Sequence, residues 1–226
     1  MKFNGKRIKE DNKYQKHESY KISKTRTINF KEVQQDGSID RVDINILLKE
    51  NQEAIFSEEY KPKAIDTCKK VDIMVFIYGI TDDRDIDKGS EATLYLYDVK
   101  DTIGGKDVIF HLVEQWKEGI RSALDFTRYA TETRYNIGVI TRNYDTKRID
   151  EEITKCEKEL SGISSQKNMP ALVLAKNYIN KRIVVEKELE ILKSFRNMIF
   201  FEGKEKYTYN YKLMDKNNYY LLKIES

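Results

Sequence analysis

Three charged residues at the ends of two apolar segments could form a site for a divalent cation. Asp72 lies in the apolar run 71–78 (VDIMVFIY), and Asp98 and Lys100 close a second run, 92–100 (ATLYLYDVK). Alternate residues of a strand share a face, so Asp98 and Lys100 are expected to point the same way. Strands joined by a loop usually lie close together, so Asp72 can approach Asp98. Two neighbouring carboxylates repel each other unless a cation lies between them, and Mg²⁺ or Mn²⁺ suits such ligands.

Lys100 would add a positive charge beside the reacting groups. It could orient or polarise an attacking water, or stabilise charge that develops on a phosphate. A second interpretation stays open, because a charged residue that ends an apolar run can simply mark the point where the strand emerges into solvent.

The elements that must position these residues follow a definite order along the chain. The two apolar runs predict strands, and an acidic loop at 81–91 separates them. Residues 107–131 then carry apolar side chains at helical spacing, which predicts an amphipathic helix. Residues 136–141 (NIGVIT) are rich in β-branched side chains and predict a third strand.

This order of elements resembles the PD-(D/E)XK phosphodiesterase superfamily, which includes many restriction endonucleases and defence nucleases. The resemblance covers roughly residues 50–145. It implies an α/β (α+β) fold, with a restriction-endonuclease-like central mixed sheet flanked by helices. It also implies that Asp72 and Asp98 bind a divalent metal, and that Lys100 assists the nucleophilic water.

The chain departs from the family pattern in two places. Val71 precedes Asp72 where the family often has Pro, and the second acid is Asp where Glu is commoner. Many relatives also carry a Glu on the helix before the first strand. The candidates for that position are Glu53, Glu58 and Glu59, and the sequence does not choose among them.

Two residues of the predicted helix are relevant to the candidate site. Gln115 lies where some relatives place an active-site Gln, and the alternative is an exposed polar residue. Trp116 lies on the apolar stripe, so it is expected to pack in the core and not to stack on a base.

The chain before this region, residues 1–48, is expected to form a basic arm and a β-hairpin. Residues 1–26 hold nine Lys and Arg against three acids. Alternating apolar and polar residues on both sides of Asp36-Gly37 predict the hairpin. Residues 49–61 look helical, and Pro62 would end that helix.

The chain after the predicted α/β core (residues 49–145) is expected to pack on the same domain. It spans residues 146–226 and begins with two segments at helical spacing, 146–161 and 171–196, which predict a helical hairpin. Two alternating segments then predict a terminal β-hairpin, 205–213 and 218–225.

Composition limits the classes of function. The chain has 226 residues, with 41 Lys and Arg against 38 Asp and Glu, and a net charge of +3 argues against a simple polycationic nucleic-acid binder. Two Cys and two His argue against a cysteine- or histidine-based metal site. No segment approaches the roughly 18 apolar residues of a membrane span. We therefore expect a cytoplasmic protein without a membrane partner.

Three hypotheses follow for the function. The first is a metal-dependent nuclease that hydrolyses phosphodiester bonds in DNA; a role in restriction or anti-phage defence rests on the family alone. The second is a non-enzymatic interaction subunit of a larger complex, with a vestigial nuclease-like core and C-terminal helices that bind a partner protein or form a homodimer. The third is nucleic-acid binding through the basic N-terminus. The first requires Asp72, Asp98 and Lys100 to converge.

Overall fold

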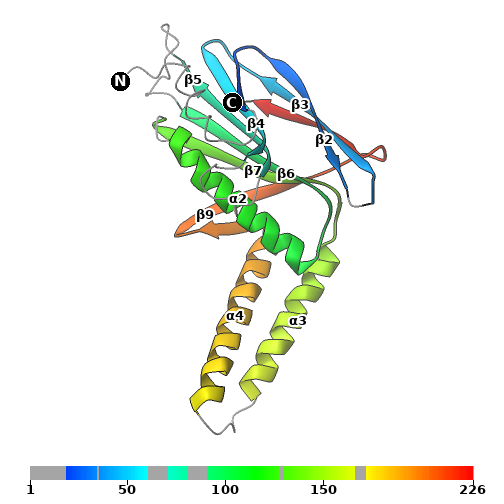
Figure 1. Ribbon diagram of the computed structural model, residues 1–226, viewed down its shortest axis with the longest axis vertical. Helices are drawn as coiled ribbons and strands as arrows, with labels where there is room; N and C mark the ends of the chain where they lie inside the picture. The colour runs from blue at the N-terminus through cyan, green and yellow to red at the C-terminus, as the bar shows by residue number, and fades with distance from the viewer. Residues whose placement is uncertain are drawn as a thin grey trace.

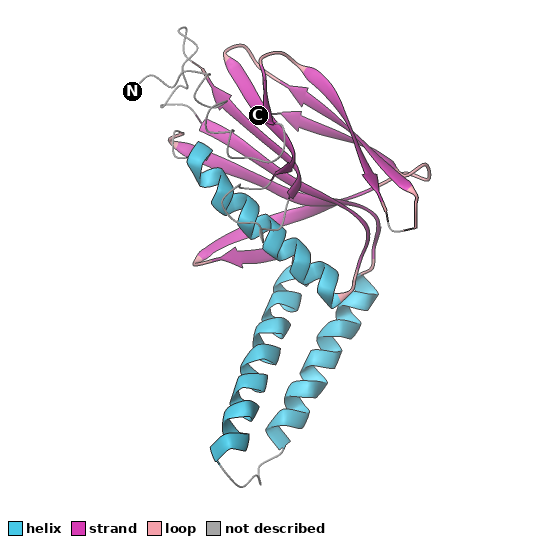
Figure 2. Cartoon of the chain, in the orientation of Figure 1, coloured by secondary structure: helices cyan, strands magenta, loops and turns pink. Residues whose placement is uncertain are grey.

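The computed structural model describes residues 19–34, 36–60, 71–80, 91–127, 130–165 and 172–225 (Figure 1). These residues form two β-sheets and three helices (Figure 2). The elements run in the order β1 (Ser19–Ile22), β2 (Arg26–Val33), β3 (Ile39–Leu47), β4 (Gln52–Tyr60), β5 (Val71–Gly79), β6 (Glu91–Ile103), α2 (Lys106–Thr127), β7 (Glu132–Tyr144), α3 (Thr146–Ser165), α4 (Leu172–Arg196), β8 (Ile199–Glu202), β9 (Glu205–Leu213) and β10 (Tyr219–Glu225).

The larger sheet has seven strands in the order β1-β4-β5-β6-β7-β9-β8. At its centre, β4, β5 and β6 form an antiparallel meander, and α2 then connects β6 to its parallel neighbour β7. β9 pairs with β7 in parallel and with β8 antiparallel, so the sheet is mixed. The protein is therefore a mixed α/β structure in which both central strands of the predicted site have neighbours on either side.

The smaller sheet has three strands in the order β10-β3-β2. β2 and β3 are antiparallel, and their connecting turn contains Gly37 at φ 79°, a conformation that glycine adopts without steric cost. β10 joins this hairpin in parallel with β3. The Asp-Gly signal at residues 36–37 thus predicted the β2–β3 hairpin correctly.

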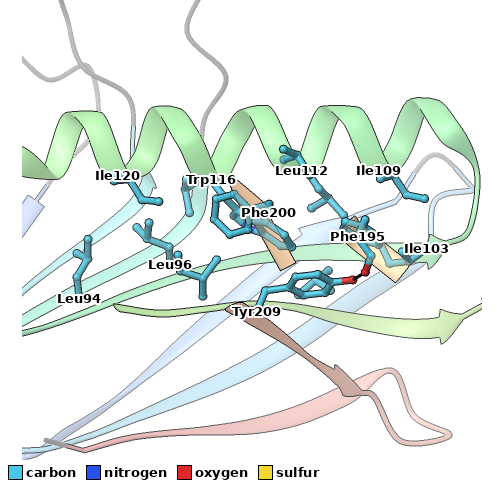
Figure 3. Packing of buried hydrophobic residues seen from close by; sticks show 14 of the residues in the cluster. Leu94, Leu96, Ile103, Ile109, Leu112, Trp116, Ile120, Phe195, Phe200 and Tyr209 are labelled. Carbon is cyan, nitrogen blue, oxygen red and sulfur yellow. Dashed lines mark hydrogen bonds between the residues drawn. The ribbon is translucent and has the colours of Figure 1, made fainter. Parts of the chain in front are cut away.

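The core has two parts, one on each face of the larger sheet. On one face, α2 packs Ile109, Leu112, Trp116 and Ile120 against the sheet, where Figure 3 shows them facing Leu94 and Leu96 of β6. On the other face, the buried residues of β3 pack against those of β5, namely Val42, Ile44 and Ile46 against Ile73, Val75 and Ile77. Each buried large aliphatic side chain contributes about 1.5–3 kcal/mol to stability.

Helices α3 and α4 form a hairpin that projects away from both sheets (Figure 1). Ile149 and Cys156 of α3 belong to the same buried cluster as Val185 and Leu192 of α4. This confirms the helical hairpin that the apolar spacing predicted. Within the described part of the chain, none of the helices has the length and apolarity to cross a membrane.

The prediction of a helix at residues 49–61 is wrong, because this segment contains strand β4. Its Glu, Gln and Ala residues favour helix in isolation, but β4 pairs with β1 on one side and β5 on the other. Ile55 is buried on the α2 face, whereas Ala54 and Phe56 are buried on the opposite face. Burial on both faces of a sheet hides the alternation that identifies a half-exposed strand.

The predicted terminal β-hairpin is also wrong, although both of its strands exist. β9 lies in the larger sheet beside β7, and β10 lies in the smaller sheet beside β3. The turn at 215–218 therefore carries the chain from one sheet to the other. The central sheet is mixed, as predicted. Among the described residues, α2 covers one of its faces and the smaller sheet covers the other.

Candidate functional site

The antiparallel pairing of β5 and β6 brings the two predicted acids together. Ile73 pairs with Tyr97, so the next position outward along the ladder places Asp72 beside Asp98. Gly119 of α2 also lies close to this end of β5. A Cβ atom on Gly119 would lie 2.7 Å from the Val71 side chain, so a larger residue would push α2 away from the strand that carries Asp72.

Lys100 lies between the two carboxylates. Its Nζ is 3.1 Å from Asp72 Oδ2 and 3.7 Å from Asp98 Oδ1. The backbone amide of Val99 donates a second hydrogen bond of 2.8 Å to Asp72 Oδ2. The structure thus brings Asp72, Asp98 and Lys100 into one cluster, as the sequence predicted, and it fixes the Asp72 carboxylate from two directions.

The three side chains form a gradient from the interior to the surface. The Asp98 side chain is completely buried, whereas those of Asp72 and Lys100 are 12% and 22% exposed. Neither oxygen of Asp98 accepts a hydrogen bond of normal geometry, and the buried indole Nε1 of Trp116 donates none. Buried polar groups without partners are rare in folded proteins and are often found where a site binds an ion or carries out chemistry.

Burial raises the pKa of Asp98 well above its ordinary value, and repulsion from the Asp72 carboxylate raises it further. The Lys100 ammonium opposes this rise, as do the nearby Asp72 backbone and Trp116 indole. The fold thus makes the ionised form of Asp98 costly. A cation that came close to this carboxylate would lower that cost.

Burial alone would lower the pKa of Lys100, but the charges of Asp98 and Asp72 outweigh burial and the net change is upward. Lys100 therefore stays protonated at neutral pH. With both acids ionised, the cluster carries one excess negative charge. A positively charged side chain next to two carboxylates can stabilise negative charge on a bound phosphate.

The donor set fits a hard cation that keeps part of its water shell. Mg²⁺ is commonly held by one or two carboxylates, with water and substrate phosphates as its other ligands. Asp72 and Asp98 match that number, and neither Asp98 oxygen accepts a hydrogen bond of normal geometry. In the described ranges, no group of three His, Cys, Asp or Glu side chains is placed to hold a metal. A metal here would also compete with Lys100 for the Asp72 carboxylate.

Glu53 does not belong to this cluster. It pairs with Tyr78 near the opposite end of β5, roughly 20 Å from Asp72 at about 3.3 Å per residue. Its buried carboxylate forms an ion pair with Lys21 and accepts a hydrogen bond of 3.3 Å from the Tyr78 hydroxyl. Glu53 is thus held by its own partners, away from the candidate site.

Glu58 and Glu59 lie on β4 close to Asp72 in the ladder. Glu58 pairs with Ile73 and is exposed. Tyr60 pairs with Val71, so the register places Glu59 opposite Asp72. The side chain of Glu59 is outside the described part of the structure, so its role stays a prediction.

Gln115 and Trp116 are both buried in α2. The interpretation of Gln115 as an exposed polar residue is therefore wrong, and its role in a site stays a prediction. Trp116 contacts three aromatic rings of the core, with centroid distances of 4.9 Å to Tyr209, 5.4 Å to Phe200 and 6.2 Å to Phe195. Its placement in the core is confirmed.

A second charged cluster, which sequence reasoning missed, ties β7 to the β2–β3 turn. Arg142 donates a hydrogen bond of 2.6 Å to the fully buried Asp40, and it lies 3.4 Å from Asp101 and 3.8 Å from Asp36. Gln34 donates to the other oxygen of Asp40 at 2.6 Å. These residues are remote from one another in sequence, so no local spacing could have revealed the cluster.

The fold and the cluster define a mixed α/β protein with two buried or half-buried acids and a lysine on adjacent central strands. Comparisons with protein-family models, with curated proteins and with solved structures each found no match to this chain.

Proposed function

We propose that this protein is a metal-dependent nuclease that hydrolyses phosphodiester bonds in DNA. The observation that carries the proposal is the convergence of Asp72, Asp98 and Lys100, with Lys100 Nζ 3.1 Å and 3.7 Å from the two carboxylates. A basic residue beside two acids that can share a hard cation is suited to phosphoryl chemistry.

The order of the surrounding elements supports the same proposal. The cluster lies in the unit β4-β5-β6-α2-β7, which is an antiparallel meander followed by a helix and a parallel strand. This order and the placement of the Asp-x-Lys element on β6 are features of the PD-(D/E)XK superfamily that the sequence resembles. A restriction-endonuclease-like core, and a place in restriction or anti-phage defence, are parts of this proposal.

Asp72 and Asp98 would hold the metal ion. When bound, Mg²⁺ supplies Lewis-acid polarisation of a phosphate oxygen and a lowered pKa for its water. Lys100 remains an ammonium because the two carboxylates raise its pKa. It would therefore donate hydrogen bonds to the attacking water or to a phosphate oxygen, while the Val99 amide keeps Asp72 in position.

The test is incubation of the full chain with circular and linear DNA and with RNA, in the presence of Mg²⁺, Mn²⁺ or EDTA. We expect metal-dependent cleavage of DNA that falls at least about 100-fold in Asp72→Asn, Asp98→Asn and Lys100→Ala. Arg134→Ala is a suitable control, because this exposed residue pairs with Glu91 near the opposite end of β6. Cleavage that persists in EDTA, or in all three site variants, would contradict the proposal.

One observation favours a second candidate, the non-enzymatic interaction subunit. Lys100 already lies between the two acids, so one of their two negative charges is compensated without a metal. The indole of the single tryptophan, Trp116, lowers the pKa of Asp98, so the fluorescence of Trp116 can distinguish the two candidates. Tryptophan fluorescence that changes with Mg²⁺ in the wild type, but not in Asp98→Asn, supports the nuclease. No change with Mg²⁺ or Mn²⁺, together with no cleavage, supports the subunit.

A further inference from the structure

Among the described residues, helix α4 has one apolar face that is buried and a second that is exposed. Val185, Leu192 and Phe195 are buried in the cluster that α4 shares with α3 and α2. Ile179 and Ile183, which lie one turn apart on another face, are 55% and 43% exposed. At 100° per residue, this second face points almost directly away from Val185 and Leu192.

The exposed face continues toward the base of the helical hairpin. Lys187, Glu190, Ile191 and Ser194 follow Ile183 at helical spacing and line a cavity of about 200 Å³. The rest of its wall comes from α2, with Val113 and Lys117, and from β8, with Phe200 and the exposed Phe201. One face of α4 therefore has projecting aliphatic side chains near its tip and a cavity with apolar walls near its base.

The charges on this face are also free to pair. Lys187 and Glu190 have no ion-pair partner among the described residues, whereas other charged residues of the hairpin surface form ion pairs such as Lys181–Glu159 and Arg182–Glu186. Figure 1 shows the hairpin projecting from the two sheets, and Lys187 and Glu190 are both exposed.

We propose that α4 packs antiparallel against α4 of a second copy of this chain, around a two-fold axis. Antiparallel pairing with Lys187 opposite Glu190 of the second copy forms two identical ion pairs. The same register places Ile183 beside Ser194 of the second copy, at the mouth of its cavity. A two-fold interface needs a surface that is complementary to itself, and this face carries both the projecting and the receiving parts and both charges.

This inference goes beyond the proposed nuclease activity and does not depend on it. Removal of Ile179, Ile183 and the cavity wall from water would favour association. The ion pairs would select the antiparallel register, because a parallel arrangement does not bring Lys187 to Glu190 by symmetry.

The test is sedimentation equilibrium of the full chain over a wide range of concentration. We expect a mass that rises with concentration to twice the 26.7 kDa of one chain. The double variant Ile179→Glu/Ile183→Glu should weaken dimerisation at least tenfold without a change in helical circular dichroism. Val33→Glu, at a residue that is 68% exposed on β2, is the matched control and should leave the dimer unchanged.

An exchange of charges tests the register. Lys187→Glu alone and Glu190→Lys alone each bring like charges together across the axis, so each should weaken the dimer. The double variant Lys187→Glu/Glu190→Lys should recover it, because opposite charges face each other again. A monomer at every concentration, a dimer that survives the Ile179/Ile183 substitutions, or a double exchange that fails to recover the dimer would overturn the proposal.

Discussion

At the scale of single residues, Asp98 is the unusual group of this protein. It is completely buried on a central strand, neither oxygen accepts a hydrogen bond of normal geometry, and the nearest cation is Lys100 at 3.7 Å. A core built for stability alone would favour an apolar residue at such a position. The buried Asp98 carboxyl group is therefore the observation on which the proposed metal site most depends.

The raised pKa of Asp98 leads to a prediction about pH. In the metal-free protein the folded state holds this proton more tightly than the unfolded state, whose Asp pKa is about 3.9. The stabilisation from Asp98 is thus fully present below about pH 3.9 and is lost as pH rises through the raised folded-state pKa. We expect wild type to lose stability relative to Asp98→Asn as pH increases across this interval. Urea unfolding of both proteins at several pH values measures the difference in their free energies of unfolding. A difference that does not change with pH would contradict the prediction.

At the scale of elements, the Arg142 cluster fastens the β2–β3 hairpin to the larger sheet. Arg142 comes from β7, and its partners Asp36 and Asp40 come from the turn and the start of β3. Glu32 of β2 also contributes to the raised pKa of Lys100, so this hairpin lies close enough to influence the candidate site.

We predict that Arg142→Met destabilises the protein by about 3–5 kcal/mol. The substitution leaves the fully buried Asp40 without its cation, and an uncompensated buried charge has a cost of this size. Arg134→Met on the same strand is the control, because the Arg134–Glu91 pair is exposed and should contribute no more than about 1 kcal/mol. Denaturant unfolding measures both, and equal losses in the two variants would show that the buried cluster has no special role.

At the scale of the whole molecule, the larger sheet is the middle one of three layers. The α2 layer covers one face and the smaller sheet covers the other. Trp116 is where the α2 layer meets the base of the helical hairpin, since it contacts Phe195 of α4, Phe200 of β8 and Tyr209 of β9. The Tyr209 hydroxyl also donates to the Phe195 carbonyl at 2.6 Å, a bond drawn in Figure 3.

We predict that Trp116→Ala lowers the free energy of unfolding by about 3–5 kcal/mol, because it leaves a cavity between α2 and residues of α4, β8 and β9. Trp116→Phe should cost less, since it keeps an aromatic ring in the same place. Thermal unfolding followed by circular dichroism measures both. A Trp116→Ala protein as stable as the wild type would show that the hairpin does not depend on this contact.

Local patterns in the sequence determined much of the framework around the site. The continuous apolar runs of β5 and β6 and the helical spacing of α2 and of the α3–α4 hairpin were predicted correctly, with ends that differ by a few residues. The convergence of Asp72, Asp98 and Lys100 was also predicted. It depends only on strand alternation and on the pairing of two strands that are adjacent in the chain.

Only the tertiary structure decided the features that depend on distant partners. β4 is a strand because β1 and β5 pair with it on its two sides. β9 and β10 do not form a hairpin because β9 pairs with β7 in the larger sheet, whereas β10 pairs with β3 in the smaller sheet. The ion pair between Arg142 and Asp40 also depends on the tertiary structure, because the two residues are about a hundred positions apart in the sequence. Local sequence patterns were enough to identify Asp72, Asp98 and Lys100 as candidates and to predict the strands that carry them. The burial of Asp98 and the second covering layer required the assembled fold, because long-range packing outweighs local preference wherever both faces of an element are buried.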